Sequence, residues 1–322
     1  MTPDVFRQTE IAVIWDFDKT LIPGYMQEPL FRHYRVDGDQ FWREVRALPK
    51  CLKEWGAELV SEDSIYLNHI LTYVRAGIFP GLNNALLRQL GSELKFFPGL
   101  PEFFSDVKER IQSHPLYQKH EIRVEHYVVS TGLRQMILGS SIAKYVDGVW
   151  GCEFVEYLPG PGFLNEAEHA QQTEDRVIQD ISYVLDNTTK TRAIFEINKG
   201  VNKFPEIDVN SNIPKEDRRI PFQNMIYIAD GPSDVPVFSL INQNGGRTFA
   251  VYQKGSYEGF KQAEMLQRQG RVQAFGEANY EPETHTYMWI MHAVEDIAGN
   301  IVKRREAALQ TKVGKPPRHL ED

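Results

Sequence analysis

Acidic side chains follow two short apolar segments of this sequence. Asp16 and Asp18 come after the segment 11–15, and Asp230 comes directly after the segment 225–229. Carboxylates that gather in one place repel one another unless a cation or a shared proton relieves them. Their hard oxygen atoms suit Mg²⁺, which takes few protein ligands and keeps several waters. If these segments are neighbours, the residues predict a carboxylate site that holds Mg²⁺.

The apolar segments themselves predict the element type that positions these residues. Segment 11–15 is a continuous apolar run rich in β-branched residues, as buried parallel strands are, and segments 126–130 and 225–229 are expected to be buried strands as well. Further strands are expected at 181–185 and 248–252.

Helical patterns lie between these strands, which favours an α/β fold with a Rossmann-like, doubly wound parallel sheet. Asp16, Ser130 and Asp230 each fall at the carboxyl end of an expected strand. Ligands of such sheets bind beyond these ends. We therefore expect the three side chains to converge on one crevice.

Each motif alone has an ordinary structural explanation. Asp-x-Asp after a strand also occurs as a solvated turn, and Asp-Gly is a frequent turn pair. Short motifs have a high rate of chance matches, so only their combination is specific.

Residues 23–95 differ from the rest, because apolar and aromatic residues recur there at helical spacing without a convincing strand. We predict a core of residues 1–22 and 96–322, a helical cap of residues 23–95, and a polar surface insertion at 200–223. The aromatic residues Trp42, Trp55 and Tyr66 are expected in the interior of the cap.

Composition narrows the possible partners. The chain has 322 residues and a net charge of −8, which argues against nucleic acid or an anionic membrane surface as a partner. Its two cysteines do not form a disulfide framework. The N-terminal residues lack the apolar region of a signal peptide, and no apolar run approaches the length of a membrane span. We expect a cytoplasmic protein.

The combined motifs resemble those of the haloacid dehalogenase superfamily of phosphatases. Asp16-Phe-Asp-Lys-Thr-Leu21 resembles its first motif, and Ser130 after Tyr-Val-Val resembles its second. Lys190, which opens a helical stretch, resembles the third, and Asp230-Gly-Pro-Ser-Asp234 the fourth. The resemblance covers about 11–135 and 180–240 and offers nothing after about 255. A helical insertion directly after the first motif is similar to the caps of phosphoserine phosphatases and pyrimidine 5′-nucleotidases.

The resemblance implies a role for each acidic residue. Asp16 would attack phosphorus and form an aspartyl-phosphate, and Asp18 would act as general acid and then general base. Mg²⁺ would be held by the Asp16 carboxylate, the Asp18 backbone carbonyl and Asp230. Asp234 would orient a lysine or a metal-bound water.

The same resemblance implies a phosphate-binding set. Ser130, the backbone N–H of Thr131 and Lys190 would bind the transferring phosphoryl oxygens, and Thr20 would hold the turn of the first motif. Lys199 is the alternative to Lys190, because the family usually has fewer residues between this lysine and the fourth motif.

Residues that follow the first motif are candidates for contact with the leaving group: Tyr25, Gln27, Glu28 and Arg32. The alternative for these residues is an ordinary solvated helix surface. A cap of this kind opens to admit a substrate and closes to exclude water.

The sequence thus predicts a phosphoric monoester hydrolase that acts on a small phosphorylated metabolite with Mg²⁺. Two alternatives stay open, namely a non-catalytic regulatory module that binds metal or phosphate on the same fold, and a phosphotransferase.

Overall fold

A seven-stranded sheet forms the centre of the computed structural model, which describes residues 8–162, 164 and 176–313. Its strand order is β4-β3-β2-β1-β5-β6-β7, and β4 alone among these strands runs antiparallel to its neighbour. The strands are β1 (Glu10–Trp15), β2 (Arg123–Leu133), β3 (Gly148–Val155), β4 (Asp180–Tyr183), β5 (Met225–Ala229), β6 (Arg247–Tyr252) and β7 (Ala274–Glu277).

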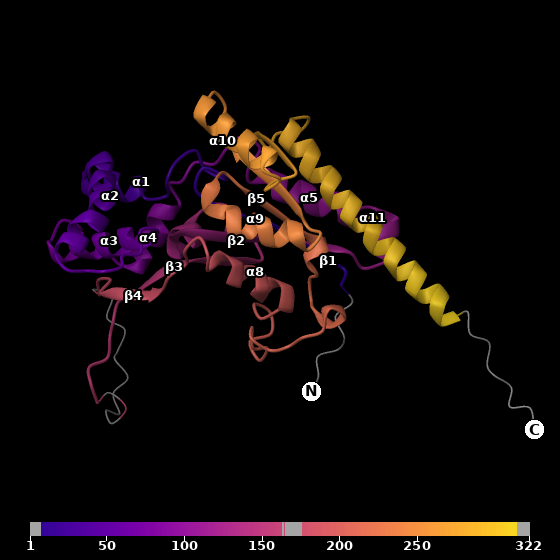
Figure 1. Ribbon diagram of the computed structural model, residues 1–322, viewed down its shortest axis with the longest axis horizontal. Helices are drawn as coiled ribbons and strands as arrows, with labels where there is room; N and C mark the ends of the chain where they lie inside the picture. The colour runs from indigo at the N-terminus through magenta and orange to yellow at the C-terminus, as the bar shows by residue number, and fades with distance from the viewer. Residues whose placement is uncertain (1–7, 163, 165–175, 314–322) are drawn as a thin grey trace, which may run out of the picture.

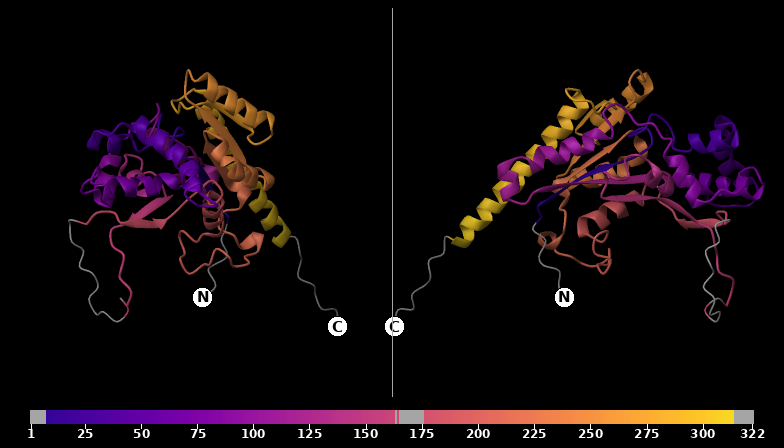
Figure 2. Two further views of the ribbon diagram at one scale, coloured as in Figure 1. Left: turned by 60° about the vertical axis from the view of Figure 1, so that its left-hand side comes forward. Right: turned by 180° about the vertical axis from the view of Figure 1, so that it is seen from behind.

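The central strand β1 is buried on both faces, which explains its continuous apolar sequence. Helices α8 (Lys190–Lys199) and α9 (Val235–Gln243) cover one face, and α5 (Glu102–Gln112) and α11 (His285–Val313) cover the other (Figures 1 and 2). Trp15 pairs with Val128 of β2 and with Ile228 of β5, so β1 and β5 end close to the level of Val128, whereas β2 continues to Leu133. The predicted α/β fold with a doubly wound, mostly parallel sheet is confirmed.

Four helices lie together beside the sheet (Figure 1). They are α1 (Glu28–Tyr34), α2 (Gly38–Glu54), α3 (Ile65–Arg75) and α4 (Asn84–Gly91). Tyr66 is buried among them and Trp42 is half-buried, whereas Trp55 is 77% exposed, so the expectation of a buried Trp55 was wrong. The reason is that α2 ends at Glu54, which leaves Trp55 at its cap, beyond the helical repeat. The boundaries of core, cap and 200–223 insertion stay predictions.

Two glycines let α4 pack closely on α7 (Arg134–Gly139), the helix that follows β2. A Cβ on Gly91 would lie 2.0 Å from the carbonyl oxygen of Met136. A Cβ on Gly139 would lie 1.7 Å from the carbonyl oxygen of Arg88. Both distances are shorter than any van der Waals contact, so only glycine allows this approach. Helix α4, and with it the group of helices α1–α4, is thereby held against the segment that follows Ser130.

The C-terminal part completes the sheet with β6, α10 (Tyr257–Arg268), β7 and α11, and the family resemblance offered nothing for the elements after β6. Tyr280, between β7 and α11, is fully buried, and its hydroxyl donates a 2.7 Å hydrogen bond to the carbonyl oxygen of Thr20. Its ring packs on Trp15 at 5.6 Å. This region therefore supports the turn that follows β1. No helix within the described ranges is long and apolar enough to cross a membrane.

Tyr280→Phe tests this support. The substitution leaves the buried Thr20 carbonyl without its donor, so the free energy of unfolding is expected to fall by about 1–3 kcal/mol. Urea denaturation measures it. Tyr257→Phe is the matched control, because that side chain is 70% exposed, and it should leave the stability unchanged. Equal stability of the two variants would show that the hydrogen bond does not support the turn.

Candidate active site

A buried lysine joins two of the predicted acidic residues. Lys190 Nζ donates to Asp16 Oδ1 at 2.7 Å and to Asp234 Oδ1 at 2.6 Å, and all three side chains are at most 8% exposed. Burial disfavours the ammonium ion, but the two carboxylates outweigh this effect and raise the pKa of Lys190. Three segments far apart in the sequence therefore meet at a charge-assisted contact.

The alternative lysine lies elsewhere. Lys199, at the other end of α8, donates to the carbonyl oxygens of Val209 at 2.5 Å and Ser211 at 2.7 Å. The structure thus brings Lys190, and not Lys199, to the carboxylates.

The segment after β1 turns sharply, and this turn positions Asp18. The amide N–H groups of Thr20 and Leu21 both bond to the Phe17 carbonyl oxygen, at 3.2 and 2.9 Å. Asp18 Oδ1 accepts the backbone N–H of Met26 at 3.0 Å, and Thr20 Oγ1 lies 3.4 Å from Asp16 Oδ2. Thr20 therefore contacts the Asp16 side chain directly, and its predicted role in holding the turn stays a prediction.

Carboxylates outnumber cations in this buried site. One oxygen from each of Asp16, Asp230 and Asp234 lies within 4.8 Å of the others. Burial, opposed by Lys190 and reinforced by the charge of Asp234, raises the pKa of Asp16 to about 6. Burial and the charges of Asp16 and Asp234 raise the pKa of Asp230 to about 7. Burial and the charge of Asp16 raise the pKa of Asp18 well above its usual range.

The donor set fits a divalent cation. Asp234 Oδ1 already accepts hydrogen bonds from Lys190 Nζ and from the Tyr227 hydroxyl, at 2.6 Å each. The Asp230 carboxylate, by contrast, has no bonded lysine or arginine among the described residues. Buried hard oxygen atoms with excess negative charge are the environment that Mg²⁺ favours. Of the predicted metal ligands, the carboxylates of Asp16 and Asp230 lie close together, and Asp234 lies beside them. The Asp18 carboxylate is not part of this group, and its predicted contribution is the backbone carbonyl.

Ser130 lies at the same edge of the sheet, two residues beyond Val128, which pairs with Trp15. It is 1% exposed, and its Oγ accepts the N–H of Gly132 at 3.0 Å. The pairing of β2 with β3 is irregular between Val129 and Leu133, so the backbone around Ser130 and Thr131 departs from the regular ladder.

Three contacts around this edge were missed from the sequence. Tyr66 of α3 donates its hydroxyl to the carbonyl oxygen of Thr131 at 2.6 Å. Met26 Sδ accepts the N–H of Leu133 at 3.0 Å. The Tyr227 hydroxyl on Asp234 is the third. Tyr66 and Tyr227 look like ordinary apolar positions of a helix and a strand, and Met26 looks like an ordinary apolar residue of a turn, so the sequence carries no signal for these contacts.

The four predicted specificity residues do not form one group. Tyr25, Glu28 and Arg32 line a groove of about 330 Å³ beside the segments 22–24 and 93–95, where Arg32 pairs with Glu93 at 2.7 Å. Gln27 instead is 2% exposed, and its Oε1 has no hydrogen-bond partner in the described part of the chain. A solvated helix surface therefore describes Glu28 and Arg32, but it does not describe Gln27.

The lysine of α8 bridges a carboxylate that follows β1 and a carboxylate that follows β5 in an α/β protein, which agrees with the motif resemblance to the haloacid dehalogenase superfamily. The chain belongs to the same family as an uncharacterized protein of Borreliella burgdorferi. The two are 43% identical over 291 residues, which cover 89% of this chain and 98% of the relative. No protein-family model matches the chain.

Solved structures with a similar chain path share little sequence with this protein. A HAD family hydrolase of Salmonella enterica serovar Typhi is 13% identical, with a TM-score of 0.47, over 85% of this chain and 68% of that one. A phospho-aspartyl intermediate analogue of phosphoserine phosphatase is 13% identical, with a TM-score of 0.44, over 83% and 93%. A predicted phosphatase of Clostridium acetobutylicum is 14% identical, with a TM-score of 0.38, over 91% and 98%. These values are too low to assign a substrate or a residue role to this chain.

The raised pKa values predict how stability depends on pH and metal. Between the ordinary carboxyl pKa of 3.8 and the folded-state values of about 6 and 7, the folded chain holds protons that the unfolded chain has released. The free energy of unfolding contributed by Asp16 and Asp230 therefore falls as pH rises through this window. At pH values above the window, Mg²⁺ should restore stability, because it binds the folded carboxylates.

Thermal denaturation in EDTA and in Mg²⁺ measures this effect. At a pH above the window, Asp230→Asn should raise the midpoint of the metal-free chain by a few °C and reduce the rise caused by Mg²⁺. Asp63→Asn, at an exposed position, is the control and should behave like the unsubstituted chain. A midpoint that does not respond to Mg²⁺ in the unsubstituted chain would contradict the proposed cation site.

Proposed function

We propose that this protein is a Mg²⁺-dependent phosphomonoester hydrolase that acts on a small phosphorylated metabolite through an aspartyl-phosphate on Asp16. The observation that carries this proposal is the buried Lys190 ammonium between the Asp16 and Asp234 carboxylates. Such a lysine gives an anionic phosphoryl group a cationic partner directly beside a carboxylate nucleophile.

Asp16 has the contacts that a nucleophile needs. Lys190 fixes Oδ1 at 2.7 Å, while the side-chain contact of Oδ2 is the longer one of 3.4 Å with Thr20. Oδ2 would attack phosphorus, so that a new O–P bond forms as the bond to the leaving oxygen breaks. Water would then cleave the aspartyl-phosphate and release phosphate.

Asp18 suits the proton transfers of both steps. Burial and the charge of Asp16 raise its pKa well above the usual range, which favours the protonated carboxyl group that a general acid needs. It would donate this proton to the leaving oxygen and then accept one from the attacking water. Its bond to the Met26 N–H at 3.0 Å fixes the orientation of the carboxyl group.

The remaining groups would bind the phosphoryl oxygens. Ser130 lies at the same edge of the sheet as Asp16, and the backbone N–H of Thr131 follows it. Together with Lys190 they would donate to oxygens that gain charge in the transition state. Mg²⁺, held by Asp16, Asp230 and the Asp18 carbonyl, would supply further neutralisation of that charge.

Gln27 is the candidate we favour for contact with the leaving group. A buried carboxamide oxygen without a partner costs stability, which contact with a bound molecule would offset. Gln27 also directly follows Met26, whose backbone holds Asp18. Tyr25, Glu28 and Arg32 stay weaker candidates, because they line a groove beside the segments that connect the helices to the sheet.

Substitution of the two first-motif carboxylates tests the reaction. With Mg²⁺ and an aryl phosphate, Asp16→Asn should reduce hydrolysis to background, because no nucleophile remains. Asp18→Asn should lower kcat by about 10²–10⁴-fold through loss of acid–base catalysis.

Acid quenching followed by peptide mass spectrometry should find phosphate on the Asp16 peptide of the unsubstituted chain, and EDTA should abolish turnover. Binding of phosphate without turnover would favour the non-catalytic module instead, and transfer of phosphate to an added alcohol in preference to water would favour the phosphotransferase. Asp63→Asn is the activity control.

The two lysines of α8 give a matched pair for a further test. Lys190→Met should abolish activity and lower the free energy of unfolding by about 3–5 kcal/mol, because two buried carboxylates lose their cation. Lys199→Met should retain kcat/KM, since Lys199 bonds only to backbone carbonyls in the described contacts. Steady-state kinetics and urea denaturation measure both effects, and loss of activity on substitution of Lys199 alone would overturn the assignment.

A further inference from the structure

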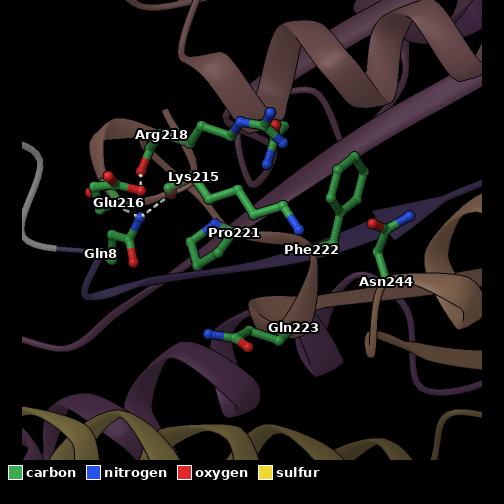
Figure 3. A pocket seen from close by; sticks show the side chains of 9 residues that line it. Gln8, Lys215, Glu216, Arg218, Pro221, Phe222, Gln223 and Asn244 are labelled. Carbon is green, nitrogen blue, oxygen red and sulfur yellow. Dashed lines mark hydrogen bonds between the residues drawn. The ribbon is translucent and has the colours of Figure 1, made fainter. Parts of the chain in front are cut away.

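A second pocket lies at the amino-terminal ends of the central strands, whereas the carboxylates lie at their carboxyl ends (Figure 3). It has a volume of about 250 Å³ and is formed where β1 and β5 begin, where α8 ends and just after α9. At about 30 Å³ for each water in the liquid, this volume holds a small metabolite rather than a single water. Its lining residues are Gln8, Asn198, Lys215, Glu216, Arg218, Pro221, Phe222, Gln223 and Asn244.

Side-chain amides hold the backbone around this pocket. Gln8 Nε2 lies within hydrogen-bond distance of the carbonyl oxygens of Lys215, Glu216 and Arg218, at 2.8, 3.1 and 3.0 Å. Asn198 Nδ2 donates to the carbonyl oxygen of Ile220 at 2.7 Å. The pocket is therefore a fixed part of the fold, with a backbone that side chains from distant segments hold in place.

Two cations line the pocket without a carboxylate partner. Lys215 and Arg218 form no ion pair within the described residues, although Glu216 lies between them in the sequence. Arg218 Nε donates only to the carbonyl oxygen of Ile213, at 3.2 Å. The Lys215 side chain extends away from Gln8 toward Phe222 (Figure 3). Because Glu216 is the one carboxylate in the lining, the two cations leave the pocket with a net positive charge on a chain whose net charge is −8.

Asn198 adds a second requirement for a molecule that binds in this pocket, namely a hydrogen-bond donor. Its side chain is 0% exposed, and its Oδ1 has no hydrogen-bond partner in the described part of the structure. An unpaired buried acceptor is costly, so a molecule in this pocket gains affinity when it offers an N–H or O–H donor. The exposed amide side chain of Gln223 supplies both donor and acceptor groups nearby.

We propose that this pocket binds a small anionic metabolite that also carries an O–H or N–H donor, and that this site is separate from the catalytic one. Lys215 and Arg218 bind the anionic group, and Asn198 accepts the donor. The proposal does not depend on the chemistry at Asp16, because every residue that it uses lies at the opposite edge of the sheet.

Inorganic phosphate is the probe, because at neutral pH it combines negative charge with an O–H group, whereas sulfate lacks the O–H. Calorimetric titration of the full chain in EDTA isolates the pocket, since the excess of carboxylates at the catalytic site disfavours an anion there without metal. We expect one saturable phosphate site, with weaker binding of sulfate.

The double variant Lys215→Gln/Arg218→Gln should bind phosphate at least tenfold more weakly while it retains basal kcat and KM. Lys50→Gln/Lys53→Gln removes the same charge from the distant helix α2 and should bind phosphate as the unsubstituted chain does. Absence of a saturable site, or equal affinity in both double variants, would overturn the proposal. Equal affinity for phosphate and sulfate would overturn the role of Asn198.

Discussion

The structure depends on one interaction, the Lys190 ammonium that lies between the carboxylates of Asp16 and Asp234. Buried charges are costly, and this pair of contacts is tolerated only because the geometry is good and both carboxylates have further donors. Thr20 contacts Asp16, and Tyr227 and Ser233 donate to Asp234. Even so, the carboxylates exceed the lysine in charge, and burial together with this excess raises the pKa values of Asp16 and Asp230. The site is thus prepared for an added cation at the expense of the stability of the metal-free fold.

The strand ends of this site could be predicted because their physical cause is local. A strand that is buried on both faces must be apolar throughout, so 11–15 and 225–229 stand out, and a charged residue can follow only where the strand leaves the core. Lys190 was harder to predict, because two lysines begin and end the same helix. The start of α8 is set by Asp186, whose Oδ1 accepts the N–H groups of Thr188 and Thr189. That turn fixes which lysine faces the carboxylates.

Tertiary contacts explain what the sequence did not reveal. Tyr280 bonds to Thr20 across 260 positions of sequence, and no local pattern distinguishes it from other tyrosines. The edge strand β7, Ala274–Glu277, has four residues and no β-branched side chain, so it lacks the signal that revealed β1 and β5. The bond of Tyr66 to Thr131 likewise depends on how α3 packs on the sheet. The role of a side chain was therefore predictable where burial of a single strand or helix decides it. It was not predictable where the role depends on contact between elements far apart in the sequence.

The carboxylate site and the second pocket lie at opposite ends of the central strands, and the distance between them limits how they can influence each other. Strand β1 has six residues, which at about 3.3 Å per residue places its ends roughly 20 Å apart. That distance exceeds the Debye length of about 8 Å at physiological ionic strength, so the charges of Lys215 and Arg218 have little direct effect on the carboxylates. Helices α8 and α9 offer a mechanical connection instead, because α8 carries Lys190 at its first residue and Asn198 near its last, and α9 (Val235–Gln243) is flanked by Asp234 and Asn244. Any influence of one edge on the other must therefore pass through small displacements of these two helices, which pack against each other along the same face of the sheet.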